Sequence, residues 1–257
     1  MSMTYAPETW AIARRWFWHL RHEPMQLLAA VAQPALWLLL FGNMFAQAGE
    51  RFTGGAPDYI SFMTAGVVVM TVFNSAISGG IEVLFDREQG FHDRLLAAPI
   101  HRTALLAGRY IYILALSAVQ GAVILSVAML MGVRIATGAP GALVTLLIAV
   151  LMGIGIATLS LALAFVLKGH GSFFGIIVLI NLPLIFISSA LAPLEAMPFW
   201  LSALAHLNPM TYAIDGARSL IVSGWQPSIL VPVAVALLIF DLATFGLGAR
   251  VYQGMAD

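Results

Sequence analysis

Six long stretches free of Asp, Glu, Lys and Arg dominate this chain, and each is long enough to cross a lipid bilayer. Their limits are residues 24–48, Tyr59–Ile81, residues 110–133, residues 135–167, Gly169–Leu194 and a last stretch from Pro227 up to Arg250, which only Asp241 interrupts. The hydrocarbon core of a bilayer takes about 20 helical residues, and Pro34 in the first stretch predicts a kink rather than a stop. The sequence therefore predicts an all-α polytopic membrane protein with six transmembrane helices.

Composition excludes a water-soluble globule. Of the 257 residues, 61% are hydrophobic and 9% are charged, so solvated side chains cannot cover the surface of a soluble fold of this size. Twelve basic residues balance twelve acidic ones, which gives no reason to expect a nucleic-acid partner. The chain contains no Cys, which excludes disulfides, thiolate metal sites and Cys nucleophiles.

The basic residues predict how six spans are oriented. With both termini in the cytoplasm, that side holds nine basic residues and the outside three, namely Arg51, Arg134 and Arg218. This positive-inside bias favours six spans over five or seven. The first apolar stretch exceeds the roughly 7 to 15 residues of a signal peptide, which indicates an uncleaved anchor. We expect a single domain, residues 1–257, in the cell (inner) membrane.

Residues 7–22 predict an amphipathic helix ahead of the first span. At about 100° per residue, the two halves of the wheel separate as follows: Trp10, Ile12, Ala13, Trp16, Phe17 and Leu20 on one, and Arg14, Arg15, His19, Arg21 and His22 on the other. A helix with Arg toward the headgroups and Trp at the boundary suits the cytoplasmic leaflet. It serves either as a generic anchor or as a functional element.

The connection between the second and third stretches concentrates charge. Residues 82–109 carry eight of the twenty-four formally charged side chains of the chain. Apolar residues recur at helical spacing within Asp86–Ala98, Glu88 can meet His92 one turn later, and Pro99 ends the pattern. A short charged helix with an apolar ridge fits a groove on another protein. The simpler alternative, which composition alone favours, is a solvated loop.

The connection before the last stretch, residues 194–226, is long but nearly uncharged. Its charged residues are Glu195, Asp215 and Arg218. Pro198 and Pro209 each suit the first turn of a helix, Asn208 suits an N-cap and Gly224 a C-terminal stop. This pattern predicts two short helices that dip into the outer leaflet, with Asp215 and Arg218 paired at i+3. They form either a lid over an exit path or a packing element.

At these two connections the sequence resembles the ABC type-2 permeases, the membrane subunits of ATP-driven exporters such as the daunorubicin-resistance, nodulation-factor and polysaccharide export permeases. The cytoplasmic motif of that family is matched by Glu88, Gly90, Leu95, Leu96, Pro99 and Arg102. The outer motif is matched by Leu194, Met197, Pro198, Trp200, Leu207, Asn208, Pro209, Tyr212, Ile214, Asp215 and Arg218. Phe91 and His92 depart from the family pattern, which often has Thr and Leu there.

The resemblance implies roles for these segments. Pro7–His22 becomes an elbow helix, and Phe85–Ala98 becomes a coupling helix received by a nucleotide-binding subunit. The ATPase-coupling residues are then Phe85, Asp86, Arg87, Glu88, Gly90, Phe91, Asp93, Arg94, Leu95, Leu96, Pro99 and Arg102. The outer-gate residues, within residues 194–226, are Pro198, Trp200, Asn208, Pro209, Tyr212, Asp215 and Arg218. The implied assembly is a homodimer of six-span subunits with two ATPase subunits, and export rather than import also follows from the resemblance.

The sequence of this chain contains no ATP-binding motif. It contains no G-x-x-x-x-G-K-[ST] sequence, and Lys168 is the single Lys, so the chain lacks a P-loop. ATP and Mg²⁺ are therefore expected on a separate P-loop ATPase partner, and no cofactor on this chain.

Other functions have less support from the sequence. The six His residues show no metal-binding spacing, and no Ser, His and carboxylate set lies within the spans as an embedded hydrolase needs. We therefore expect no catalytic residue and no metal site. Asp241 keeps an ion-coupled carrier of a hydrophobic solute as an alternative, although it can instead pair with a basic group near the cytoplasmic surface. A membrane scaffold that transports nothing is a further alternative.

Aromatic and amide side chains within the spans are candidates for a path taken by an amphipathic substrate. They are Trp37, Phe41, Phe62, Phe73, Asn74, Asn181 and Phe186. The alternative is ordinary core or lipid-facing positions. Glycines such as Gly79, Gly80, Gly153, Gly155, Gly171 and Gly175 favour close helix packing, with dimerisation as a second reading. The sequence thus predicts an exporter subunit for a drug, a lipid or a glycan without distinguishing among them.

Overall fold

The computed structural model describes residues 5–22, 24–45, 59–90, 101–167 and 169–253. Within these ranges all regular secondary structure is helical and there is no strand, which confirms the all-α prediction. The elements are α1 (Tyr5–His22), α2 (Pro24–Met44), α3 (Tyr59–Glu88), α5 (Arg102–Leu130), α6 (Gly138–Val166), α7 (His170–Phe186), η2 (Leu194–Ala196), α8 (Phe199–Ala205), α9 (Pro209–Arg218), η3 (Ser219–Ser223) and α10 (Pro227–Gln253).

Four of the described helices, α3, α5, α6 and α10, are long and apolar enough to cross a membrane. Two others are apolar but fall short of that length: α7 has 17 residues, and α2 is represented by the stretch Leu28–Met44. A multi-pass membrane protein is therefore supported, while six spans stay a prediction.

Three helix boundaries differ from those expected from the charge-free stretches. α3 does not end at Ile81 but continues to Glu88, and α5 begins at Arg102, so that Arg109 lies inside it. α7 ends at Phe186 rather than near Leu194. The first two differences have one cause: buried charges inside a helix are tolerated when they pair with one another, and the partners come from distant parts of the chain.

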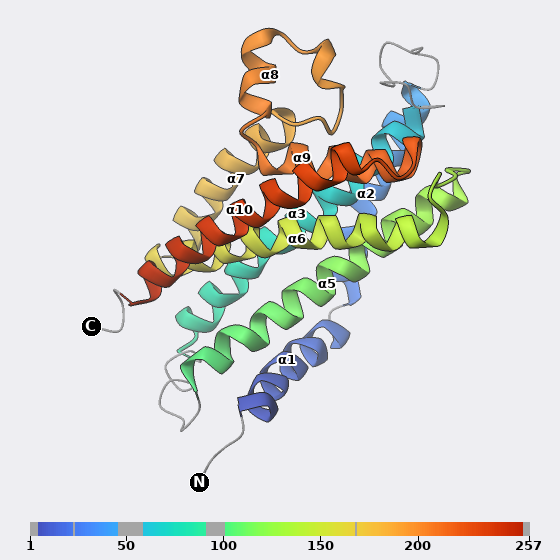
Figure 1. Cartoon of the computed structure of the whole chain (residues 1–257). Helices are drawn as coiled ribbons and strands as arrows, with labels where there is room; N and C mark the ends of the chain where they lie inside the picture. Colours follow the sequence, from blue (N-terminus) through green and yellow to red (C-terminus); the bar gives the residue numbers. More distant parts are fainter. Residues whose placement is uncertain (1–4, 23, 46–58, 91–100, 168, 254–257) are drawn as a thin grey trace.

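α3 is the central helix of the bundle. It packs against α2, α5, α6, α7 and α9, and in the view of Figure 1 it passes behind α6. Most of its residues are buried, among them Phe62, Met63 and Phe73. Its neighbours come very close at Gly80, where an added Cβ would lie 2.5 Å from the Ser160 carbonyl oxygen on α6. A movement of α3 therefore displaces these five helices, which pack against it.

The segment between α7 and α10 divides into an exposed part and a buried part. α8 projects from the bundle on the side away from α1 (Figure 1) and exposes Phe199 and Trp200. α9 is packed among α3, α6 and α10. The predicted helix signals are confirmed, because the Asn208 side chain caps α9 by accepting from the Met210 N–H and Gly224, with φ of 96°, follows the end of η3. Insertion of either helix into the outer leaflet stays a prediction.

α1 lies alongside α5 at the other end of the bundle (Figure 1). The expected apolar face is partly confirmed, because Ala13 and Trp16 are buried, whereas Trp10 is exposed. The contact is close at Gly108 on α5, where an added Cβ would lie 2.7 Å from the Thr9 carbonyl oxygen. The helix predicted for residues 7–22 therefore packs against protein, while its place in the membrane interface stays a prediction.

Candidate functional site

Four consecutive side chains in the last turn of α3 contact four other helices: Asp86 reaches α1 and α5, Arg87 reaches α6, and Phe85 and Glu88 both reach α7. Neighbouring residues of an α-helix point about 100° apart, so four in a row cover the whole circumference. Each finds a contact on α1, α5, α6 or α7. We call these four residues the α3 hub.

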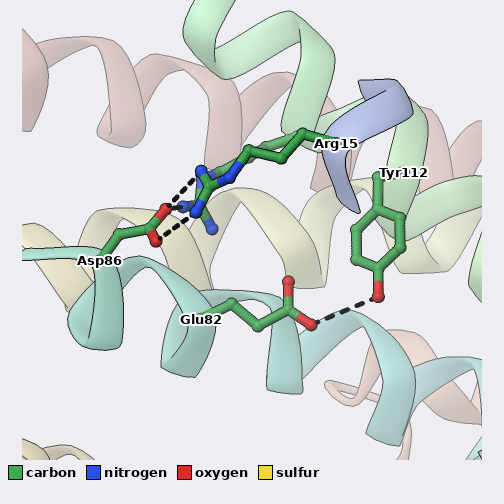
Figure 2. Close-up of polar contacts among 5 residues, drawn as sticks. Arg15, Glu82, Asp86 and Tyr112 are labelled. Carbon is green, nitrogen blue, oxygen red and sulfur yellow. Dashed lines mark hydrogen bonds and ion pairs between the residues drawn. The ribbon is translucent and has the colours of Figure 1, made fainter. Parts of the chain in front are cut away.

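Asp86 joins α1 and α5 to the hub. The Arg15 guanidinium faces both of its carboxylate oxygens, with the shorter contact 3.0 Å from Nη2 to Oδ1 (Figure 2). Arg109 on α5 donates to the other oxygen, Oδ2. Asp86 and Arg109 are both buried, whereas the Arg15 side chain is 40% exposed. One carboxylate thereby pairs with two cations that come from different helices.

Trp16 on α1 completes this junction with an aromatic surface. The guanidinium carbon of Arg109 lies 4.5 Å from the ring centroid of Trp16, and that of Arg15 lies 4.9 Å away. Tyr112 on α5 packs against the same indole, with 5.7 Å between ring centroids. Cation–π contacts strengthen when they are shielded from water, so Trp16 holds both cations near Asp86.

A second polar contact ties the start of α1 to the start of α5. The Glu8 Oε2 atom accepts from the His101 backbone N–H at 3.0 Å and lies 3.0 Å from its Nδ1. The hydrogen bonds from the His101 backbone and ring lower the pKa of Glu8. α1 is therefore fastened at both Glu8 and Arg15, and is not a free helix on the lipid surface.

Arg87 and Glu88 connect the hub to α6 and α7. Arg87 donates to the carbonyl oxygens of Ala164 at 2.6 Å and Phe165 at 3.2 Å, in the last turn of α6, where a cation also interacts favourably with the helix dipole. Glu88 lies 2.5 Å from His170 Nδ1 at the first residue of α7. Phe85 packs against the same imidazole, with 4.1 Å between ring centroids.

The structure covers only the first part of the predicted coupling helix. Residues 85–88 are the end of α3 rather than the start of a separate helix, and they are followed by a turn at Gly90, whose φ is 65°. Asp86 is directed inward, whereas Phe85 and Glu88 are each 46% exposed. Outside the described residues lie Phe91, Asp93, Arg94, Leu95, Leu96 and Pro99 with the predicted Glu88–His92 pair, and the Arg102 side chain is also not described.

At the opposite end, Arg218 of α9 is held by three elements. Its guanidinium donates to Asp215 Oδ1 at 3.2 Å and to the Ser189 carbonyl oxygen, and its Cζ lies 3.8 Å from the Phe62 ring centroid on α3. Burial lowers the pKa of Arg218 to about 10 and raises that of Asp215. The predicted i+3 pair is confirmed, but it belongs to a larger junction that includes the Ser189 hydroxyl, 2.6 Å from Asp215 Oδ1.

The predicted outer-gate residues fall into two groups. Asn208 donates to the carbonyl oxygens of Leu184 and Ile187 at the end of α7, and with Asp215 and Arg218 it fixes α9 in the bundle. Tyr212 donates to the His206 carbonyl oxygen. Pro198 and Trp200 are instead exposed at α8. In the structure α9 is packed within the bundle and α8 is exposed, while a lid over an exit path stays a prediction.

An apolar groove of about 460 Å³ lies among α2, α3 and α7. Four of the predicted path residues line it: Trp37, Asn74, Asn181 and Phe186. The Asn181 amide donates to Asn74 Oδ1 at 3.1 Å, which places a polar pair on its wall. The ring of Phe41 stacks on Trp37 with 4.9 Å between centroids. Phe62 and Phe73 do not form part of such a surface, because both are fully enclosed in the core.

A smaller cavity, about 220 Å³, lies among α2, α3 and α5 and shares Gln33, Pro34 and Asn74 with the groove. Its wall is more polar and includes Glu82, whose Oε1 lies 3.5 Å from the Tyr112 hydroxyl (Figure 2). The sequence indicated Glu82 only as part of the charged cytoplasmic connection. Its spacing from Asp86, one helical turn, was the available signal that it lies on the same inward face.

Two further polar positions fall outside these sites. Asp241 on α10 is buried beside Gly155, and among the described residues no basic side chain forms an ion pair with it. The suggested pairing near the cytoplasmic surface is thus absent from the described chain. In the same ranges, no group of three His, Asp or Glu side chains is arranged to hold a metal ion.

These features define a class of protein: a multi-pass helical membrane protein in which one charged helix turn connects four other helices at one end of the bundle. Comparison with known proteins agrees. Residues 7–222 match the family of ABC-2 type transporters. The chain belongs to that family and is a transport permease, the membrane component rather than the ATPase of an ABC transporter.

Named relatives point the same way. Over 209 residues the chain is 39% identical to the transport permease ycf38 of Porphyra purpurea, covering 81% of this chain and 72% of the relative. The corresponding protein of Cyanophora paradoxa is 34% identical, covering 85% and 76%. The daunorubicin resistance ABC transporter permease protein DrrB1 of Streptomyces coeruleorubidus is 28% identical, covering 78% and 70%. Family membership implies an ABC ATPase subunit as partner.

Proposed function

We propose that this chain is the membrane subunit of an ATP-driven exporter that moves an amphipathic small molecule, drug or lipid-linked compound out of the cytoplasm or the inner leaflet. The α3 hub carries the proposal, because one helix turn at the end of the central helix contacts α1, α5, α6 and α7 together. In the proposed assembly, two copies of the chain sit in the cell (inner) membrane with both termini in the cytoplasm and bind two P-loop ATPase subunits, which hold ATP and Mg²⁺.

The exposed side of the hub suits reception of force from a partner. Phe85 and Glu88 combine an apolar ring with a carboxylate, and both remain partly exposed where α3 ends. Asp86 and Arg87 bind the neighbouring helices on the inner side of the same turn. A push received at Phe85 and Glu88 is therefore passed directly to the rest of the bundle through the contacts of Asp86 and Arg87.

In the proposed cycle, closure of the ATPase dimer displaces the segment that begins at Phe85 and tilts α2, α3 and α7. Interfaces between packed helices shift between discrete arrangements rather than deforming continuously. The groove lined by Trp37, Asn181 and Phe186 lies among these three helices, so their tilting changes its width. We propose that it is part of the substrate path, with an exit on the side where α8 projects.

A charge reversal at Glu88 tests the coupling role. In proteoliposomes that contain the chain and its ATPase, Glu88→Arg should lower ATP-dependent efflux of an amphipathic fluorescent probe, and the accompanying ATP hydrolysis, on the order of tenfold, because an acidic contact becomes repulsive. Membrane insertion should be unchanged.

His170→Gln is the matched control, since it removes the internal partner of Glu88 while leaving the exposed carboxylate in place. It should retain most of the coupled activity. Equal losses in both variants would show that Glu88 acts only by holding α7, and unchanged efflux in Glu88→Arg would remove the docking role altogether.

Asp241 supports the second candidate, an ion-coupled carrier, because it is a buried carboxylate within α10. In that case transport should persist in ATP-free vesicles that carry an ion gradient, and Asp241→Asn should abolish it. The exporter predicts no transport without ATP under the same gradient.

A further inference from the structure

We propose that the polar cavity beside Glu82 binds the cationic amine head of the substrate, while the adjoining groove binds its apolar body. This inference rests on the proposed transport function, and it adds a substrate class to that function, namely amphipathic amines.

The carboxylate of Glu82 lacks a complete set of partners. Its Oε2 is shielded from solvent and accepts no hydrogen bond from the described residues, and its Oε1 has only the long 3.5 Å contact with the Tyr112 hydroxyl. The cations Arg15 and Arg109 make their direct contacts with Asp86, one turn further along α3, and act on Glu82 only through longer-range electrostatic attraction. A buried carboxylate oxygen without a donor is costly, so the cavity favours an occupant that brings N–H groups and positive charge.

Other groups on the wall suit the same occupant. Ser75 Oγ also makes no hydrogen bond within the described chain, and the side chains of Gln33 and Gln120 add amide oxygens that can accept from an ammonium group. An ammonium head has three donors and no acceptor, which matches a wall on which acceptors gather around one carboxylate.

The two cavities form one site with a polar end and an apolar end. Gln33, Pro34 and Asn74 line both. Along α3, at about 1.5 Å per residue, Glu82 lies about 12 Å from Asn74 and about 9 Å from Glu88. The head would therefore sit near the hub end of the bundle, and the apolar body would extend along α3 into the larger groove.

The larger groove is accessible from the side of the bundle. Leu182 and Phe186 of α7 line it and are more than half exposed. An amphipathic molecule in the inner leaflet can consequently enter with its apolar body among lipid-like side chains and place its amine at Glu82.

Binding of two probes with the same chain distinguishes this site from general lipophilicity. Radiolabelled dodecylamine, which is protonated at pH 7, and radiolabelled dodecanol are each bound to the purified full chain in phosphatidylcholine nanodiscs, with empty nanodiscs subtracted. The wild-type chain should bind the amine about tenfold more tightly than the alcohol, as a charge-assisted hydrogen bond provides. Equal binding of the two probes would overturn the proposal, because the positive charge of the head would then contribute nothing to binding.

Two variants test whether the preference for the amine over the alcohol comes from Glu82. Glu82→Gln keeps the shape and removes the charge, so the preference for the amine should disappear. Glu195→Gln, an exposed glutamate in η2, is the matched control and should keep the full preference. A preference that survives Glu82→Gln would contradict the assignment.

A photoactivatable dodecylamine diazirine provides a measurement on the wild-type chain that does not depend on folding of the variant. It should label the α3 peptide around residues 71–82, and labelling confined to α10 would overturn the site. Neither experiment uses ATP. Loss of amine selectivity with ATP-driven efflux intact would remove this site alone, whereas amine selectivity without ATP-driven efflux would leave the site and remove the exporter.

Discussion

At the scale of single residues, the junction around Asp86 shows how one carboxylate can organise three helices. Arg15 and Arg109 lie 71 and 23 residues away in the sequence and reach the same side chain. Removing a shared partner leaves two cations together, one of them buried, and an unpaired buried charge costs far more than an exposed one.

The loss of the shared carboxylate and the loss of one exposed cation can be measured separately. Asp86→Asn should lower the free energy of unfolding, measured by SDS titration in mixed micelles, by about 3–5 kcal/mol. Arg15→Ala should cost about 1 kcal/mol or less, because Arg15 is 40% exposed and the buried Asp86–Arg109 pair persists without it. Equal costs for the two variants would show that the junction is not organised by Asp86.

At the scale of elements, the helical segments and the capped helix ends follow from the sequence, whereas the other ends follow from tertiary contacts. Charge-free stretches mark the apolar bodies of the helices, and Asn208 and Gly224 mark ends because caps are local features. The extension of α3 to Glu88 was not predictable from local sequence, because it depends on Arg15 from α1. The same limit applies to Glu82, whose inward position depends on the packing of α2 and α5 around α3.

The packing of α1 on α5 gives a prediction at this scale. Gly108→Ala should separate the two helices and lower the free energy of unfolding by about 1–3 kcal/mol, because the added methyl meets the Thr9 backbone. Gly175→Ala on α7 is the matched control, since an added Cβ there has nothing within 4 Å. Both positions lie in helix interiors, so both changes raise helix propensity similarly, and the difference between the two variants in SDS titration isolates the α1 contact. A stability for Gly108→Ala as high as that of Gly175→Ala would contradict this packing.

At the scale of the whole molecule, the bundle has a charged end and an apolar segment at the opposite end. The hub is at one end, and the exposed aromatic residues of α8 are at the other (Figure 1). The sequence predicted this division from the placement of its charges, and the structure adds the contacts that link the hub to α1, α5, α6 and α7. Substrate chemistry could not be read from the sequence, because the polar cavity is assembled from α2, α3 and α5.

The most direct test of the account asks on which side of the membrane the hub lies. The chain has no Cys, so in a single-cysteine variant a membrane-impermeant maleimide can label only the introduced residue. Labelling therefore reports whether that residue is accessible from outside the membrane. In intact cells, Leu207→Cys, at an exposed position near α8, should be labelled, and Gln89→Cys, in the exposed turn after α3, should be labelled only after the membrane is permeabilised. Labelling of Gln89→Cys in intact cells would place the hub outside, where no ATPase can reach it, and would contradict the account.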